Sequence, residues 1–417
     1  MLNSFYSGLT GLNSYSSSMS IIGNNLANIN TIGYKTNTAN FQDLLSQMRS
    51  TDGTGNPMQV GLGVSIGSIE ANFSQGSLQS TSEATNAAIQ GAGFFILTNE
   101  TGQDRYYSRA GNFTFDAQGY LVHPNGGYVA GWTQRDANNE IDTSTAIGRI
   151  KIPMGSTIEP KASNLVSIIS NLDANAAVDD LYSTSITVHD SLGAAHIVTF
   201  NFKNTGPGAW DYDITASGDE STGGTPGTPF SLTTGSLSFD ADGKLTAPAA
   251  NPVFTTPTWV NGANTQEITW SLYSDDGSAN LTGYASASTT SFASQNGFTS
   301  GTLSSVIIGP DGTIQGLFNN GETLSMAKLA IANFNNPKGL IKSGSNNYIR
   351  GNAGEPAIGE AESGGRGGIT GGALEMSNVD LAAEFTSMIV SERGYQANSR
   401  IITTSDEMMQ EVLQLKR

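Results

Sequence analysis

Apolar residues recur with heptad spacing at both ends of the chain, and this pattern restricts the fold more than any other feature. Near the N-terminus, steps of three and four that pass through Ser16 and Gly23 join Leu2, Phe5, Leu9, Leu12, Met19 and Leu26. Near the C-terminus, steps of seven join Leu374, Leu381, Met388, Tyr395, Ile402 and Met409. Phe385 and Leu413 lie on the companion position of this stripe, which is four residues after a member of the series. Such a stripe is buried only against another helix. The pattern predicts a helix at each end, the second from about Ala373 to Lys416.

Two such helices bury part of their surface against each other, and the rest requires another partner. Glu392, Ser399 and Asp406 also occupy the companion position of the C-terminal stripe, which leaves polar groups in need of partners from neighbouring chains. We therefore expect assembly to order the ends. Identical chains that associate head to tail form an open helical polymer when the rotation does not close. The heptads alone fit equally well an antiparallel helix hairpin that caps a β-protein.

Between the ends, apolar residues alternate with period two, as in residues 63–73, 185–188, 196–202 and 303–307. Dipeptides that favour positive φ punctuate the chain: Asn125-Gly126, Asp242-Gly243, Asp276-Gly277, Asp311-Gly312 and Asn320-Gly321. With 50 glycines and only 37% apolar residues, this pattern predicts antiparallel strands joined by tight turns, in more than one domain. Two segments without periodicity, residues 30–60 and 351–372, are predicted to be linkers.

Charge and residue content exclude several classes of partner and site. The formal net charge of −17 disfavours nucleic acid, and no run approaches the roughly 18 apolar residues that insertion into a membrane requires. The absence of cysteine excludes disulfides and thiolate metal sites. Residues 1–6 lack the basic and apolar regions of a cleaved secretory signal. The chain is therefore expected either to stay in the cytoplasm or to be exported without a cleaved signal.

Three patterns that resemble reactive or ligand-binding motifs have simpler explanations. Gly63-Val64-Ser65-Ile66-Gly67 matches a nucleophile elbow, but the alternation continues to Phe73 and predicts a strand where the elbow needs a helix. Asp240-Ala241-Asp242-Gly243 has its glycine too early for a calcium loop and is predicted to be a hairpin turn. His123, His189 and His196 are expected to be structural. No catalytic, cofactor-binding or metal-ligating residue is predicted, although spacing alone leaves open a carboxylate pair of a secreted, glycosidase-like β-rich hydrolase.

Two long motifs occupy opposite ends of the chain. The first comprises Ser7-Gly8-Leu9 and Asn24-Asn25-Leu26-Ala27-Asn28, followed by Asn30-Thr31-Ile32-Gly33-Tyr34-Lys35. The second comprises Gly372-Ala373-Leu374-Glu375-Met376-Ser377-Asn378-Val379-Asp380-Leu381, followed by Arg393-Gly394-Tyr395-Gln396-Ala397-Asn398. Both resemble motifs of the rod and hook proteins, the axial protein family of the bacterial flagellum. In the interior, Asn296-Gly297-Phe298, Asp311-Gly312-Thr313-Ile314 and residues 334–340 resemble the hook members, and the length agrees because distal rod subunits are typically shorter.

The resemblance implies a multidomain α+β fold, in which the terminal α-helices form a coiled-coil core domain and antiparallel β-rich inner and outer domains are nested between them. The expected core domain comprises residues 1–29 and 373–417, and an extended linker follows at residues 30–70. The inner β domain is expected at residues 71–148 and 298–372, with the outer β domain inserted at residues 149–297. The resemblance is weak across the middle of the chain.

The resemblance also implies a non-enzymatic subunit without cofactors that polymerises with itself into the flagellar hook, a bendable tube that transmits motor torque to the filament. It implies export to the outside of the cell by the flagellar type III apparatus, and contacts with the distal rod protein, the hook cap and the hook-filament junction protein. The apolar heptad residues of both ends would be assembly residues, and Phe5 and Leu9 resemble the family's export element. The alternatives are the hydrolase above and a distal rod or other tubular fibre subunit.

Overall fold

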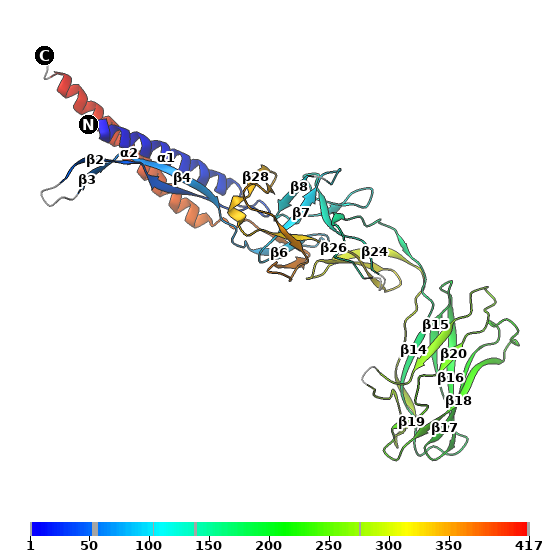
Figure 1. The fold of residues 1–417 in the computed structure, drawn as a ribbon. Coiled ribbons are helices and arrows are strands. Elements are labelled where there is room, and N and C mark those ends of the chain that lie inside the picture. The colour runs from blue at the N-terminus through cyan, green and yellow to red at the C-terminus, as the bar shows by residue number, and fades with distance from the viewer. Residues whose placement is uncertain (1, 52–56, 103, 137–139, 275–276, 415–417) are drawn as a thin grey trace. The chain divides into compact units, whose positions relative to one another are not determined.

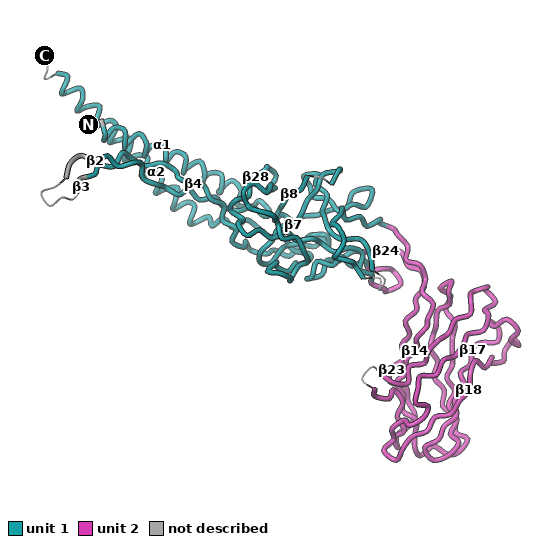
Figure 2. The backbone as a smooth tube through the Cα atoms, viewed as in Figure 1, with its two compact units in different colours: residues 1–154, 306–316, 324–417 teal, residues 155–305, 317–323 magenta. Residues whose placement is uncertain are grey.

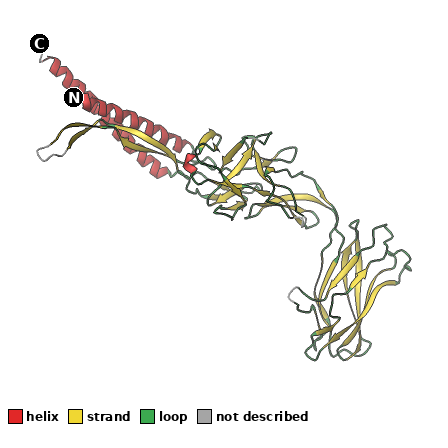
Figure 3. Ribbon diagram, in the orientation of Figure 1, coloured by secondary structure: helices red, strands yellow, loops and turns green. Residues whose placement is uncertain are grey.

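A computed structural model of the chain describes residues 2–51, 57–102, 104–136, 140–274 and 277–414. The chain divides into two compact units (Figure 2). Unit 1 comprises Met1–Met154, Val306–Gly316 and Leu324–Arg417, and unit 2 comprises Gly155–Ser305 and Leu317–Thr323. Both long helices belong to unit 1, whereas the described part of unit 2 consists of strands and loops (Figure 3).

The two terminal helices lie side by side (Figure 1). They are α1 (Leu2–Ala27) and α2 (Leu381–Gln414). Helix α2 starts where Oδ1 of Asp380 accepts the backbone N–H groups of Ala382 at 2.9 Å and Ala383 at 3.1 Å, which is an N-cap arrangement. Across the described residues, neither helix combines the length and apolar character that crossing a membrane requires.

The predicted start of the second helix near Ala373 is wrong. Residues 373–375 form strand β32 (Ala373–Glu375), which pairs with β5 (Leu78–Ser80). Leu374 is buried in this strand and is therefore not a helix residue. Backbone pairing with β5 thus overrides a heptad spacing that Leu374 shares with Leu381. The predicted end of the helix at Lys416 lies outside the described residues.

The segment expected to be an extended linker, residues 30–70, consists largely of paired strands. β1 (Asn37–Asp43) is antiparallel to β4 (Val64–Ala71), and β2 (Ser46–Thr51) is antiparallel to β3 (Pro57–Gly61). β1 lacks the alternating apolar residues that predict a strand, and polar cross-strand contacts such as Asn40 Nδ2 to Ser68 Oγ at 3.0 Å take their place. The second predicted linker, residues 351–372, likewise contains the short strands β30 (Ala357–Gly359) and β31 (Gly368–Gly371).

The main sheet has fourteen strands among the described residues, and its central path is β13-β24-β25-β26-β11-β7-β8-β29-β28. β13 and parts of β24, β25 and β26 belong to unit 2. Besides β30, the strands are β7 (Phe94–Thr98), β8 (Arg105–Ser108), β9 (Thr114–Phe115), β10 (Leu121–Val122), β11 (Tyr128–Trp132), β12 (Gly148–Arg149), β13 (Thr157–Ile158), β24 (Gly301–Ile308), β25 (Thr313–Phe318), β26 (Thr323–Leu329), β27 (Ile331–Asn333), β28 (Ile341–Gly344) and β29 (Asn347–Ile349). Separately, β6 (Ala87–Gln90) pairs with β31, and residues 337–339 form a 3-10 turn.

An aromatic cluster around Phe94, Phe334 and Tyr348 fills the core of unit 1.

Unit 2 is a sandwich of two five-stranded sheets around one core. One sheet contains β15 (Leu181–His189), β16 (Ala195–Gly206), β17 (Ala209–Ser217), β18 (Pro229–Phe239) and β19 (Leu245–Ala247). The other contains β14 (Leu165–Asn171), β20 (Val253–Thr255), β21 (Glu267–Ser271), β22 (Leu281–Thr282) and β23 (Thr289–Gln295). Between them, the ring of Trp270 lies 5.0 Å from that of Phe200 and 5.2 Å from that of Tyr212. Burial of alternate residues from both sheets explains the period-two pattern of the sequence.

The expectation of antiparallel strands needs one correction. β14 runs parallel to both β21 and β22, while its pairing with β23 is antiparallel. Parallel neighbours are joined by long connections and therefore leave no tight-turn signal in the sequence. The predicted turns are otherwise confirmed where they are described, because Gly126, Gly243, Gly312 and Gly321 all have φ between +73° and +89°. In the remaining dipeptide, Asp276-Gly277, Asp276 lies outside the described residues.

Candidate functional site

The two end motifs meet at a buried cluster of three charged residues in unit 1. Lys35 follows α1, Arg109 follows β8, and Glu375 ends β32. Nζ of Lys35 lies 2.7 Å from Oε1 of Glu375, and Nη1 of Arg109 lies 3.4 Å from Oε2. Lys35 also donates to the carbonyl of Ser74 at 2.6 Å, and the N–H of Gly76 donates to Glu375 at 2.9 Å. Each end motif thus contributes one member of the cluster.

Burial controls the electrostatics of this cluster. It lowers the pKa of Lys35, although the carboxylate of Glu375 acts in the opposite direction. Burial likewise lowers the pKa of Arg109, again against the effect of Glu375. The desolvation of each cation thus exceeds its attraction to the shared carboxylate. Glu375 is therefore the group on which both buried cations depend.

Backbone contacts join the same two motifs. The N–H of Gly33 donates to the carbonyl of Glu375 at 2.7 Å, and the N–H of Thr36 donates to Oδ1 of Asn378 at 2.9 Å. Gly33 has φ +67°, and a Cβ there would lie 2.6 Å from the backbone nitrogen of Ala110. A larger residue would therefore clash with the backbone that follows β8 and displace Gly33 from its bond to Glu375.

Asn25 connects the end of α1 to the start of α2. Its Nδ2 donates to the carbonyl of Asn37 at 2.8 Å and to Oε1 of Glu384 at 3.0 Å. Its Oδ1 accepts the N–H of Asn37 at 3.0 Å and the hydroxyl of Tyr34 at 3.2 Å. Burial raises the pKa of Glu384, even though the hydrogen bond from Asn25 acts to lower it. The buried amide thus uses all of its hydrogen-bonding capacity, which explains the Asn and Tyr of the first motif.

Small residues form the contact between the two antiparallel helices. A Cβ on Gly11 would lie 2.6 Å from Oδ1 of Asn398, and a Cβ on Gly394 would lie 2.5 Å from the ring of Tyr15. Ser18 and Ser391 approach each other through their hydroxyl oxygens at 3.4 Å. Gly8 lies in the same contact, where a Cβ would be 3.3 Å from Cγ1 of Ile402, so side chains of one helix pack against glycines of the other. The helix pair is thus joined by glycine, serine and amide groups together with Tyr15 and Ile402.

The apolar heptad residues predicted from the sequence consequently differ in how far they are buried. Phe5, Leu12, Met19, Leu26, Met388, Tyr395 and Ile402 are half-buried, whereas Leu9, Leu381, Phe385, Met409 and Leu413 are exposed in the single chain. The side chain of Leu2 lies outside the described residues. The companion position of the intramolecular contact holds Glu384, Ser391, Asn398 and Ser405, not Phe385 and Leu413. The expected register is one residue away from the observed one, because small residues pack closer than apolar ones.

Sequence reasoning missed this inner face, yet the sequence contains a signal for it. Glu384, Ser391, Asn398 and Ser405 are spaced by seven, and each can approach a backbone closely or form a hydrogen bond. On α1, Gly11, Ser18 and Asn25 lie opposite Asn398, Ser391 and Glu384, again with spacing of seven. A search for small and polar residues with heptad spacing, beside the apolar ones, identifies both faces.

A second polar cluster, in unit 2, surrounds His196. Its Nε2 lies 3.0 Å from Oδ2 of Asp190, and its Nδ1 lies 2.7 Å from Oε2 of Glu220. The imidazole stacks on the indole of Trp259 with 3.6 Å between ring centroids. Asp190 also accepts the amide of Asn261 and two backbone N–H groups of its own turn. The cluster joins three loops, and its partners match the expectation of a structural histidine.

The pH dependence of unit 2 is expected to depend on Asp190. Burial acts to raise the pKa of this carboxyl, but hydrogen bonds from Asn261, His196 and the turn backbone outweigh it and hold the pKa below its ordinary value. A lowered pKa contributes stability above about pH 4 that is lost as the pH falls below it. Asp190→Asn should therefore reduce the loss of unfolding free energy of unit 2 on acidification, measured by urea unfolding at a series of pH values. Asp211→Asn, at an exposed position, should leave that loss unchanged. The same dependence on pH in the original protein and both variants would show that Asp190 does not control it.

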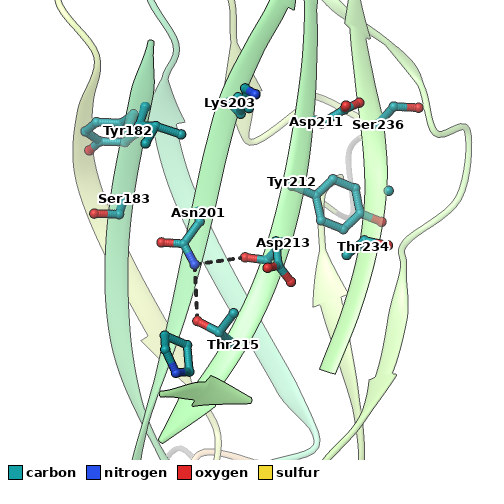
Figure 4. Close-up of a pocket in the computed structure, with 13 residues that line it drawn as sticks. Tyr182, Ser183, Asn201, Lys203, Asp211, Tyr212, Asp213, Thr215, Thr234 and Ser236 are labelled. Carbon is teal, nitrogen blue, oxygen red and sulfur yellow. Dashed lines mark hydrogen bonds between the residues drawn. The ribbon is translucent and has the colours of Figure 1, made fainter. Parts of the chain in front are cut away.

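A groove of about 760 Å³ lies on the outward face of β15–β18 and contains two carboxylates (Figure 4). Asn201 in its wall donates to Thr215 Oγ1 at 3.1 Å and to the carbonyl of Asp213 at 3.3 Å. Its carboxylates, Asp211 and Asp213, both project from β17 between buried residues. Glycosidases hold two carboxylates on opposite sides of the scissile bond. Two carboxylates from one strand do not provide that arrangement.

Four family models match the chain in sequence order. They describe the flagella basal body rod protein at residues 5–35, the flagellar hook protein FlgE/F/G D1 domain at 88–170, the flagellar basal body protein FlaE D2 domain at 162–298, and the flagellar basal body rod FlgEFG protein C-terminal at 370–415. The flagellar hook protein FlgE of Borreliella burgdorferi is 36% identical over the whole of both chains. The chain belongs to the flagellar hook protein family.

Other hook proteins support the same assignment. FlgE of Treponema pallidum is 34% identical over the whole of both chains, and FlgE of Escherichia coli is 32% identical over 99% of this chain and all of its own. The crystal structure of Helicobacter pylori flagellar hook protein FlgE2 has a similar fold, with a TM-score of 0.54 over 72% of this chain and all of that one at 18% identity. The chain is thus a structural subunit of the hook of a bacterial flagellum and not an enzyme.

Proposed function

We propose that the chain is exported by the flagellar type III apparatus without a cleaved signal and polymerises outside the cell, through its terminal helices, into a bendable tube that joins motor to filament. The observation that carries this proposal is that different residues of the helices form the contact within the chain and the exposed apolar surface. Small and polar residues lie at the centre of the intramolecular contact, whereas several large apolar residues, among them Phe385 and Ile389, are exposed. A single chain leaves that apolar surface in water, so burial against other copies stabilises the polymer.

Exposed apolar residues occur along most of α2. Leu381, Phe385 and Ile389 follow one another at helical spacing near its start, where Ile389 is 57% exposed. Toward the other end Ile401, Met408, Met409, Val412 and Leu413 are also exposed, on more than one side of the helix. On α1, Tyr6 and Leu9 are exposed as well. Contact between different faces of identical chains generates an open helical assembly, which fits a tube.

We further assign the finer domain boundaries on this basis. Residues 1–29 and 381–417 would form the coiled-coil core domain, with residues 30–70 extending from it. Residues 71–148 and 298–380 would form the inner domain, and residues 149–297 the inserted outer domain. The separate core of unit 2 supports an inserted domain. Its Ser- and Thr-rich outer faces, which exchange hydrogen bonds with water at low cost, would let neighbouring subunits shift as the tube bends.

The remaining partners follow from the family. We propose contacts with the distal rod protein, the hook cap and the hook-filament junction protein at the ends of the tube. Phe5 and Leu9 would form the export element in the unfolded chain and join the assembled helices later. Leu9 is exposed and Phe5 half-buried in the folded chain, which leaves both available for contacts between subunits.

Negative-stain electron microscopy of the purified chain under polymerising salt tests the proposal. The full chain is expected to form curved tubes, and a variant that lacks residues 1–27 and 381–417 is expected to remain a folded, β-rich monomer. These limits retain Glu375, because its loss would leave Lys35 and Arg109 without their carboxylate. Tubes from the truncated variant would exclude the helices as the assembly surface. Globular particles from both proteins, even when hook fragments are added as seeds, would contradict polymerisation.

A further inference from the structure

A cavity of about 260 Å³ lies in the β-rich part of unit 1, and Arg109 is one of the residues that line it. Phe94, Gln75 and Asn333 line it, together with the backbone of Gly91 and Gly93. The two glycines have φ of +108° and +129°, so this part of the wall carries no side chains. The volume accommodates several water molecules or a small ion with part of its hydration shell.

Arg109 has unused hydrogen-bonding capacity next to this cavity. The side chain is 4% exposed, and its guanidinium lies 5.1 Å from the centroid of the Phe94 ring. Among the described residues its only hydrogen-bond acceptor is Glu375, at a long 3.4 Å, and Nε has no partner. A buried guanidinium ordinarily pairs its several N–H donors. This one is only partly satisfied.

The charge of the cluster is also unbalanced. Lys35 and Arg109 share the single carboxylate of Glu375, which already accepts from Lys35 at 2.7 Å and from the N–H of Gly76 at 2.9 Å. One positive charge therefore remains beside the cavity, in a chain whose acidic residues outnumber its basic ones by 36 to 19. A buried cation without a full counter-charge favours an anion from solution.

We propose that this cavity binds a small inorganic oxyanion of the phosphate or sulfate class, which accepts the free donors of Arg109. An oxyanion matches the planar fork of a guanidinium better than chloride does, because two oxygens can accept parallel N–H groups. Its charge completes the neutralisation of the cluster where the two end motifs meet. The bound anion thereby stabilises the folded form of unit 1 by mass action.

Thermal unfolding of the full-length monomer in phosphate, against chloride at equal ionic strength, tests the proposal. Phosphate is expected to raise the unfolding midpoint of unit 1 along a saturating curve, whereas its general salting-out effect does not saturate. Removing Arg109 itself would also break its pair with Glu375, so Asn333→Asp is the better variant. It places a negative charge in the cavity wall without changing its shape, and should weaken phosphate binding about tenfold or more.

Asn335→Asp is the matched control, because it makes the same charge change two residues away at an exposed position outside the cavity. It should leave the phosphate curve unchanged. A rise that does not saturate, or one that Asn333→Asp and Asn335→Asp reduce equally, would overturn the proposal. A saturating rise with acetate but not with phosphate would also overturn it, and would indicate the carboxylate of a second copy as the occupant.

Discussion

Glu375→Ala is expected to destabilise unit 1 by about 3–5 kcal/mol, the usual cost of removing one partner from a buried ion pair. The substitution removes the acceptor of Lys35 at 2.7 Å, of Arg109 at 3.4 Å and of the Gly76 N–H at 2.9 Å. Lys35 is completely buried, so water does not replace the lost carboxylate without local opening. Denaturant unfolding followed by the circular dichroism of the helices measures the effect on unit 1.

The two-unit organisation supplies an internal control for that experiment. Of the four tryptophans, Trp210, Trp259 and Trp270 lie in unit 2, so tryptophan fluorescence reports mainly on that unit. Its transition should not move in Glu375→Ala. Glu83→Ala removes an exposed carboxylate from unit 1 and should change stability by no more than about 0.5 kcal/mol. A loss of less than about 1 kcal/mol in Glu375→Ala would mean that Lys35 reaches solvent, contrary to its burial here.

The strands and turns of this chain were predictable because their determinants are local. In β16, His196, Val198, Phe200 and Phe202 all point inward, which is the alternation read in the sequence. Asp240 accepts the N–H groups of Asp242 and Lys244, and this closes the turn that the Asp-Gly pair indicated. Neither inference depends on any residue far away in the chain.

The buried cluster of Lys35, Arg109 and Glu375 was not predictable in the same way, because its contacts join residues that are distant in the sequence. Lys35 and Glu375 are 340 positions apart, and each is an ordinary charged residue in its local sequence. The motifs identified the family, but their chemistry became clear only when β32 placed Glu375 beside Lys35. Leu374 shows the same limit, because its heptad spacing was misleading until its pairing with β5 was known.

The apolar surface of α2 leads to a second large effect, on assembly and not on folding. Phe385→Ser combined with Ile389→Ser should raise the critical concentration for tube formation about thirtyfold or more, because roughly 2–4 kcal/mol of apolar burial is lost per subunit. The two residues are 46% and 57% exposed in the single chain. Phenylalanine, isoleucine and serine also have similar helix propensities, so the stability of the monomer should fall by no more than about 1 kcal/mol. Sedimentation of polymer from monomer at a series of concentrations measures the change.

A control with the same residue types separates this effect from a general loss of apolar surface. Phe292 and Ile197 lie on the strands of unit 2 and are 55% and 59% exposed. Phe292→Ser combined with Ile197→Ser should therefore leave the critical concentration within about threefold of the original, if the helices supply most of the apolar contact between subunits as proposed. Equal increases for both pairs of substitutions would place the main contact in unit 2. An unchanged critical concentration for the α2 pair would show that the exposed stripe of this helix does not face a neighbouring subunit, and that the small-residue contact within the chain is the full extent of its packing.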